Sequence, residues 1–130
     1  MERTQMFLLD GKAYNVDVTK LVRKFSVLDS DKSGRTQDGQ MYRDVIGTFY
    51  NYTMTISSRG ADVAALDAFW EVVSRPDVSH VCEFPYGQDT LVQQMYVTGG
   101  EQELRLITDR AAYWNEITLN FIAMSPKVVP

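Results

Sequence analysis

The chain has 130 residues and a formal net charge of −4, with 45% apolar and 12% aromatic residues. This length fits one domain with a packed core, and the composition excludes a disordered chain. The mild acidity argues against a dedicated nucleic-acid binder, and a single cysteine, Cys82, excludes a disulfide framework or a cysteine-based zinc site.

The N-terminal residues lack the basic start and long apolar stretch of a signal peptide. No run approaches the roughly 18 apolar residues of a transmembrane helix. We therefore expect a protein made in the cytosol and either kept there or released by a route other than secretion.

The first elements are predicted to form a β-hairpin. The apolar run Met6 to Leu9 ends at Asp10-Gly11, a strong hairpin dipeptide, and residues 14–18 then alternate between apolar and polar. Residues 19–30 fit both helical and strand periodicity. We favour a strand there, because no helix-capping residue is well placed.

The clearest strand signal lies in the second half of residues 41–58. Apolar and aromatic residues alternate there with Asn and Thr, which predicts one buried and one wetter face. The apolar face comprises Tyr50, Tyr52, Met54 and Ile56. Gly47, near the start of the strand, predicts a bulge or a close backbone approach.

A single helix is predicted at about residues 61–75. Apolar residues recur there at helical spacing, and Pro76 ends the segment. The apolar positions are Val63, Leu66, Phe69, Trp70 and Val73. We expect this stripe to pack on a sheet rather than to bind a ligand.

Strands return after the helix. Residues 79–84 and 91–98 read as strands separated by the turn PYGQD. Gly99-Gly100 then predicts a second hairpin, which pairs residues 91–98 with residues 103–108.

The last element, residues 113–124, alternates in part, and Pro126 ends it. Residues 127–130 are predicted to be a loose tail. The whole chain, residues 1–130, is therefore expected to be one domain of β-rich α+β class. Its form would be an antiparallel β-sandwich or barrel with one packed helix.

One polar stretch, DSDKSGRTQDGQ at residues 29–40, begins like the calcium loop of an EF-hand. Asp29, Asp31 and Ser33 occupy the first three ligand positions, and Gly34 lies at the turn. The twelfth position holds Gln40, so the bidentate carboxylate is missing. Calcium binding is therefore the weaker alternative for this stretch, because Asp, Ser and Gly occur in any turn.

We favour the interpretation that residues 29–40 are a polar assembly loop. The stretch is longer than most connections between strands, and long loops of this kind often contact a partner. The candidate assembly residues are Asp29, Asp31, Ser33, Gly34, Arg35, Thr36, Asp38 and Tyr42.

No catalytic constellation is evident in the sequence. His80 is the only histidine, and its neighbour Ser79 would point to the opposite face of a strand. The carboxylates are scattered, and Gly99-Gly100 lacks the residues of a phosphate-binding loop. We expect a structural or exposed His80, a buried Cys82, no catalytic residue and no cofactor.

Three stretches carry a resemblance to known proteins: IGTFYNYTM (46–54), FPYGQ (84–88) and YWNEITLNFIAMSP (113–126). With them, nearly the whole chain resembles short proteins encoded by phages and prophages of Gram-positive gut bacteria. That resemblance implies a virion structural protein of the tail, of the tail-tube or the distal-tail and adaptor type. It carries no catalytic residue.

Proteins of these tail classes are typically small β-sandwiches or barrels with a helix packed outside and long loops. The resemblance therefore implies a protein that assembles with itself into rings or a tube, binds other tail proteins and resides in the virion after synthesis in the host cytoplasm. DNA would pass an acid-lined lumen without specific binding, and no membrane is involved. The alternatives are a baseplate or adaptor protein and a calcium-stabilised binding module.

Overall fold

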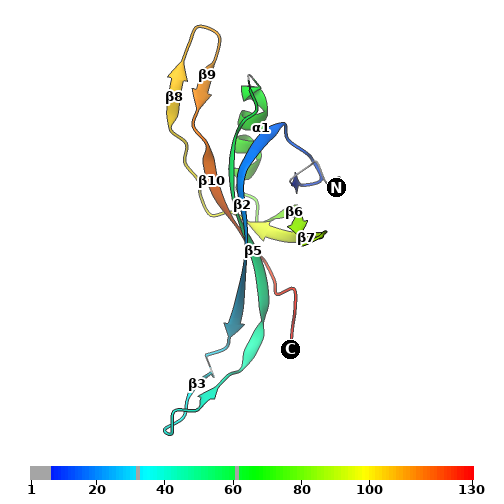
Figure 1. The fold of residues 1–130 in the computed structure, drawn as a ribbon, viewed down its shortest axis with the longest axis vertical. Coiled ribbons are helices and arrows are strands. Elements are labelled where there is room, and N and C mark those ends of the chain that lie inside the picture. The colour runs from blue at the N-terminus through cyan, green and yellow to red at the C-terminus, as the bar shows by residue number, and fades with distance from the viewer. Residues whose placement is uncertain (1–6, 32, 61) are drawn as a thin grey trace.

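The computed structural model describes residues 7–31, 33–60 and 62–130 and has a β-rich α+β fold (Figure 1). Six antiparallel strands form the main sheet in the order β1-β6-β7-β10-β5-β2, and two further sheets, β3–β4 and β8–β9, have two strands each. This confirms the predicted fold class. The elements are β1 (Leu8–Leu9), β2 (Val16–Asp29), β3 (Gly34–Arg35), β4 (Met41–Tyr42), β5 (Val45–Ser58), α1 (Val63–Val73), β6 (His80–Tyr86), β7 (Asp89–Tyr96), β8 (Leu104–Ile107), β9 (Ala112–Trp114) and β10 (Ile117–Ala123).

The main sheet folds over on itself at β10. Residues 117–121 of β10 pair with β5, whereas residues 122 and 123 pair with β7. As a result β6 and β7 run across the direction of β2 and β5 (Figure 1). The core lies between these two parts of the sheet and α1, and its largest fully buried side chains include Tyr52, Phe69, Phe84, Phe121, Met54, Ile56, Met95, Ile117 and Leu119.

The predicted alternation of β5 and β10 is confirmed. Tyr52, Met54 and Ile56 of β5 are buried, and so are the alternate residues of β10. On the opposite face the polar side chains bond to each other across the strands. Thr53 donates to Asn120 at 2.7 Å, and the hydroxyls of Thr55 and Thr118 lie 2.8 Å apart.

The predicted helix is present, although Ala61 lies outside the described residues. Asp62 caps its N-terminus by accepting a hydrogen bond from the Ala65 N–H, and Leu66, Phe69 and Val73 are buried. Asp62 also accepts a bond from the side chain of Asn15 at 2.7 Å. The cap therefore ties the helix to the residues that lead into β2.

The first predicted hairpin is correct in its turn and wrong in its pairing. Asp10 and Gly11 take positive φ angles of 52° and 79°, and Leu9 and Lys12 exchange backbone hydrogen bonds across them. However, β1 pairs with β6 rather than with β2. The Asp10 carboxylate explains this, because it accepts the Val81 N–H and contacts His80, so that the turn is fixed to β6.

The second predicted hairpin is wrong. β7 pairs with β6 and β10, whereas β8 pairs with β9, and Gly99-Gly100 lies in the segment that connects β7 to β8. A Cβ atom on Gly100 would lie 2.7 Å from Cδ2 of Leu119. Gly100 is thus used for a close approach to the core and not for a tight turn.

The C-terminal residues 127–130 were predicted to be loose, which is wrong for two of them. The Lys127 N–H donates to the carbonyl of Thr48, and the Thr48 N–H donates to the carbonyl of Val128. A Cβ atom on Gly47 would lie 2.7 Å from Cβ of Pro126. The close approach predicted at Gly47 is therefore confirmed, and it makes room for the C-terminal segment.

Candidate functional site

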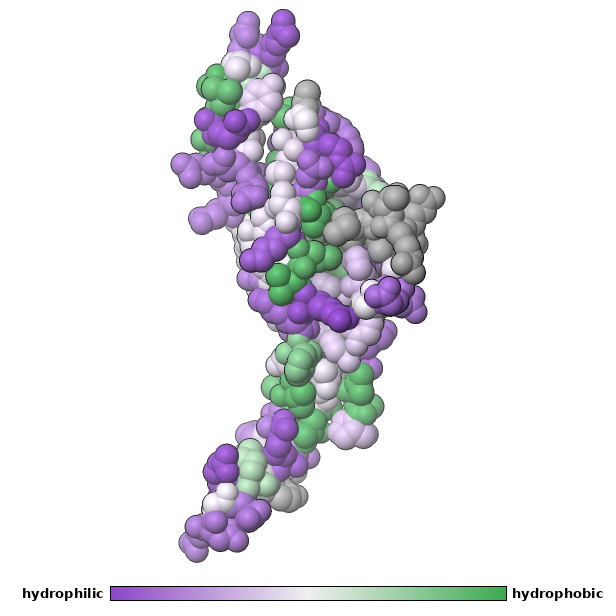
Figure 2. All heavy atoms as spheres, viewed as in Figure 1, coloured by the Kyte–Doolittle hydropathy of each residue, from purple (hydrophilic) through white to green (hydrophobic). Residues whose placement is uncertain are grey.

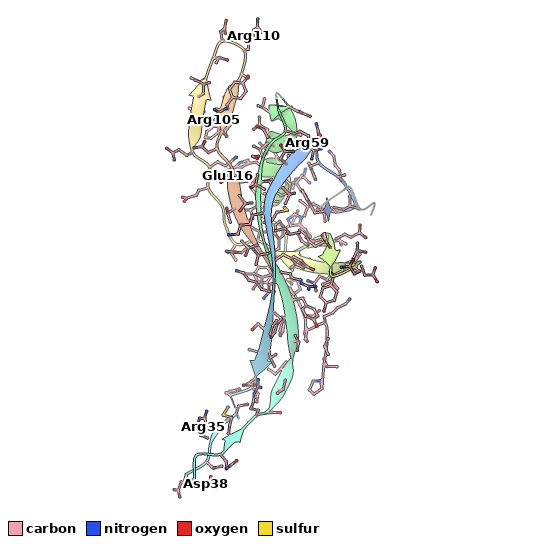
Figure 3. All side chains as sticks on the ribbon, viewed as in Figure 1. Arg35, Asp38, Arg59, Arg105, Arg110 and Glu116 are labelled. Atoms are coloured by element: carbon pink, nitrogen blue, oxygen red, sulfur yellow. The ribbon has the colours of Figure 1, made fainter. Side chains whose placement is uncertain are left out.

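Two arms leave the body at opposite ends of its longest axis (Figure 1). The long arm, residues 23–51, consists of the outer parts of β2 and β5 and ends in β3 and β4. The short arm, residues 101–116, contains β8 and β9. Arg35 and Asp38 lie at the end of the long arm, and Arg110 lies at the end of the short arm (Figure 3). These arms are the most distinctive feature of the molecule.

The long arm is a continuous two-stranded ribbon. β2 and β5 are 14 residues each and pair from Val16 opposite Ser58 to Asp29 opposite Val45. β10 stops pairing with β5 at Tyr52, so the outer part of the ribbon has no third strand alongside. Long alternating strands of β-branched and aromatic residues favour such pairing, but two-stranded ribbons are marginally stable alone.

An aromatic cluster supports the root of the long arm. The rings of Tyr50 and Tyr86 have centroids 5.1 Å apart, and the Arg23 guanidinium lies 5.5 Å from the Tyr86 ring. The hydroxyl of Tyr52 donates to the carbonyl of Pro85 at 2.9 Å. These contacts join β2 and β5 to the β6–β7 turn, which fixes the direction in which the arm leaves the body.

The residues just before the tip are cross-linked by side chains. Arg43 holds both oxygens of the Asp29 carboxylate, with its Nη2 at 2.9 Å from Oδ1 and its Nε at 3.1 Å from Oδ2. The Ser30 hydroxyl donates to the Asp44 carboxylate at 2.7 Å, and the Asp44 N–H donates to the Ser33 hydroxyl at 2.7 Å. This network gives the polar segment a defined shape within a single chain.

The tip itself is a tight turn around Gly39, which has a φ of 87°. The Thr36 hydroxyl donates to the Asp38 carboxylate, and Arg35 donates to the carbonyl of Gly39 at 3.1 Å. The hydrogen bond from Thr36 and a second from the Gln40 N–H lower the pKa of Asp38 below its ordinary value. Arg35 and Asp38 therefore use part of their polar groups to hold the turn.

The candidate assembly residues are thus brought together on the outer part of one arm. Their backbones are those of a strand pair and a turn, with Gly34 of β3 opposite Tyr42 of β4. Nothing is described of the Tyr42 side chain. Asp31 is exposed at the same end of the arm.

The calcium alternative finds no support in this geometry. The segments on both sides of residues 29–40 are strands rather than helices, and the Asp29 carboxylate is engaged by Arg43. Within residues 7–31, 33–60 and 62–130 no group of three or more His, Cys, Asp or Glu side chains is placed to hold a metal ion.

The shaft is the part of the long arm that lies between the body and the polar tip, and it exposes large apolar side chains. Phe25 is 73% exposed, and Figure 2 shows apolar residues gathered on the shaft between a mixed body and a polar tip. The exposed apolar residues of this region are Phe25, Val27, Leu28, Met41 and Ile46. Exposed apolar patches rimmed by polar residues are typical of protein–protein contact sites.

The short arm also exposes large apolar side chains. All four residues of β8 are exposed, and Ile107 is 68% exposed. Its tip is a turn in which the Thr108 hydroxyl accepts the N–H groups of Arg110 and Ala111. The exposed apolar residues of this arm are Leu104, Leu106, Ile107 and Trp114.

A hollow of about 410 Å³ lies between the C-terminal end of α1 and the segment that connects β7 to β8. Trp70, Val73, Val97 and Leu119 line it together with Arg75. Its walls are polar and apolar in about equal measure, since Ser74, Asp77 and Thr98 also line it. The described residues around it do not form a nucleophile and base pair.

His80 and Cys82 are both buried, which confirms the burial predicted for Cys82. His80 is buried, and its Nδ1 lies 2.8 Å from the Asp10 carboxylate. Burial, together with repulsion from Asp10, raises the pKa of the Cys82 thiol to about 12. The thiol is therefore protonated and unreactive at neutral pH.

Sequence reasoning missed the exposed shaft. It predicted a strand at residues 103–108 but missed its pairing with residues 112–114 and the short arm that this pair forms. Phe25 was assigned to a strand, but its exposure was not foreseen, because alternation alone does not say where a strand leaves the core. One signal was available: residues 16–29 contain neither Gly nor Pro over 14 residues, whereas most strands have about five or six, and Lys20, Arg23 and Lys24 lie among the apolar residues.

A scan against models of known protein families finds no match for this chain, and a search of curated proteins finds none either. Among the described residues, no helix has both the length and the apolar character needed to span a membrane.

Proposed function

We propose that this chain is a non-enzymatic structural protein of a phage or prophage tail, which assembles with itself into a ring or tube. The observation that carries the proposal is the pair of arms at opposite ends of a well-packed body, each with large apolar side chains exposed to solvent. Exposed apolar surface of this kind is stabilised when a partner covers it.

The placement of the arms favours a head-to-tail contact between copies. When one end of a subunit binds the other end of the next, the contact is heterologous, and the assembly is either a closed ring or an open filament. Both forms suit a tail tube. The resemblance to tail proteins of phages of Gram-positive bacteria points to the same role.

In this proposal the assembly loop is the docking end of the long arm. Residues 29–40 form the polar end of an already shaped arm, so the tip would dock on a neighbouring subunit or ring as a preformed element. Asp31, Arg35 and Asp38 remain exposed there and would set the register of docking through charge complementarity. Passage of DNA along an acid-lined lumen belongs to the same proposal.

The test is the native mass of the purified protein by light scattering, combined with electron microscopy of the same sample. We expect rings or tubes that grow as the protein concentration rises. A protein that stays monomeric at high concentration would contradict self-assembly and favour the adaptor alternative, in which another phage protein is required.

A further inference from the structure

The outer edge of β2 is the longest unpaired strand edge in the described part of the chain. β2 ends the order of the main sheet and pairs with β5 on one side only. Edge strands of this length readily pair with another chain unless charges or bulges prevent it. The pairing of β2 with β5 is irregular at two places, between Val18 and Lys20 and between Leu28 and Asp29, and it is regular from Lys20 to Leu28.

This edge is basic, although the protein as a whole is acidic. Residues 18–28 contain Lys20, Arg23 and Lys24 and no acidic residue, in a chain whose net charge is −4. Arg23 contacts the Tyr86 ring, whereas Lys20 and Lys24 are exposed and form no ion pair with a carboxylate of the described residues. The edge therefore presents two free positive charges next to the apolar shaft.

The short arm carries two acidic residues next to a second unpaired edge, and Arg105 of β8 lies over the Tyr113 ring. β8 pairs only with β9, and the exposed residues Glu101 and Glu103 precede it. Gln102 between them is anchored to the carbonyl of Asn115 at 2.8 Å, and the Asn115 N–H donates to the carbonyl of Glu103. Both carboxylates are thus held on a fixed backbone beside the apolar residues of β8.

We propose that the short arm of a second copy of this chain docks along the free edge of β2, with Glu101 and Glu103 facing Lys20 and Lys24. The exposed apolar residues of β8 would then cover Phe25 and Val27. This inference rests on the proposed self-assembly, and it specifies which surfaces of the two copies meet. Because the short arm and the edge of β2 are different surfaces of the chain, the contact is heterologous and is made head to tail.

Charge also selects against contacts between identical edges. Two β2 edges side by side would bring Lys20 and Lys24 of one copy close to those of the other, and two short arms would bring the glutamates together. Like charges opposite each other across a strand pair are destabilising. Repulsion therefore disfavours the symmetric dimer, and attraction favours the repeating contact.

The test compares three variants of the full chain by sedimentation velocity at matched concentrations. The double variants K20E/K24E and E101K/E103K each place like charges across the contact, and we expect each to weaken self-association roughly tenfold or more. The quadruple variant K20E/K24E/E101K/E103K restores opposite charges and keeps the net charge of −4. We expect it to regain association close to that of the native chain.

The control for E101K/E103K is E71K/D77K, which makes the same change of net charge at exposed positions in and after α1. It should associate like the native chain, and circular dichroism should show that all variants fold. Double variants that associate normally, or a quadruple variant that stays dissociated, would overturn this contact while leaving self-assembly in place. A native chain that remains monomeric would instead overturn the proposed function itself.

Discussion

At the residue scale, Gly47 has the tightest environment among the described glycines. A Cβ atom there would lie 2.7 Å from Cβ of Pro126 and 2.8 Å from the carbonyl oxygen of Val128. We expect Gly47→Ala to displace the C-terminal segment and to lower the free energy of unfolding by about 1–3 kcal/mol. Urea denaturation measures the loss, and hydrogen exchange at the Thr48 and Lys127 amides should become faster.

The control for this substitution is Gly34→Ala. A Cβ atom on Gly34 has no neighbour within 4 Å, and the residue does not take a positive φ angle. Equal stability losses in the two variants would argue against close packing as the cause.

The Asp10 carboxylate links a turn to the neighbouring strand and makes a pH-dependent contribution. Desolvation alone would raise its pKa, but the hydrogen bonds from His80 and the Val81 N–H outweigh it, so the pKa is lowered. A lowered carboxylate pKa stabilises the fold above the ordinary value of about 3.9, and this contribution is lost as the pH falls through the folded-state pKa.

Asp10→Asn should therefore be less stable than the native chain at about pH 6, and the difference should shrink at about pH 2.5. Asn also tolerates the positive φ of 52° found here, so the turn itself is preserved. Urea denaturation at both pH values measures the difference, with Asp109→Asn as the exposed control. A difference that stays constant with pH would contradict this role of the carboxylate.

The environment of an individual residue could be predicted where a single physical requirement decides it. The burial of Cys82 and the close approach at Gly47 follow from an apolar run and from a glycine inside a strand. By contrast, the pairing of Asp29 with Arg43 joins residues on opposite sides of the tip, and nothing in the sequence distinguishes Arg43 from the other arginines. Side-chain partners of this kind depend on strand register, which is decided by the whole sheet.

At the element scale, the position of strands and helix could be predicted well, but their pairing could not. The periodicity of residues 45–58 and 117–123 reports burial on one face, which is a local property. Pairing depends on competition between distant edges. Asp10-Gly11 forms the expected turn, yet β1 pairs with β6, because the Asp10 side chain and the buried Leu9 both favour that strand.

The end of the long arm should be separable from the fold. Residues 30–44 contribute no member of the hydrophobic core among the described residues, and Asp29 lies directly opposite Val45. Replacing residues 30–44 by Asn-Gly would close the ribbon with a two-residue turn. We expect the monomer to unfold at nearly the same denaturant concentration, whereas rings or tubes should be lost.

Light scattering and electron microscopy of the shortened chain test this expectation. The control is the native chain at the same concentration and ionic strength. Normal assembly of the shortened chain would remove the tip from the contact and leave the shaft and the short arm as the assembling surfaces.

At the scale of the whole molecule, the sequence indicated a β-rich domain, whereas the extended shape follows only from the structure. Alternating strands such as β2 read alike whether a core covers them or not. What distinguishes the inner from the outer part of β2 is the point at which β10 stops pairing with β5, at Phe121 opposite Tyr52, and this is a property of the assembled sheet. The surfaces exposed beyond that point are the ones that we assign to assembly.

Assembly through the short arm should be visible in tryptophan fluorescence. The chain has two tryptophans, and Trp114 of β9 is 39% exposed on the short arm. In a Trp70→Phe variant, Trp114 is the sole emitter. We expect its emission to shift to shorter wavelength as the concentration rises, because a second copy would remove water from the ring.

The complementary variant, Trp114→Phe, reports from Trp70, which packs against the core and should change little. Light scattering recorded on the same samples establishes whether assembly has occurred. Assembly without a shift of the Trp114 emission would place the contact elsewhere on the molecule. A shift that follows the scattering, and that disappears in E101K/E103K, would connect the short arm, its acidic residues and head-to-tail growth in one experiment.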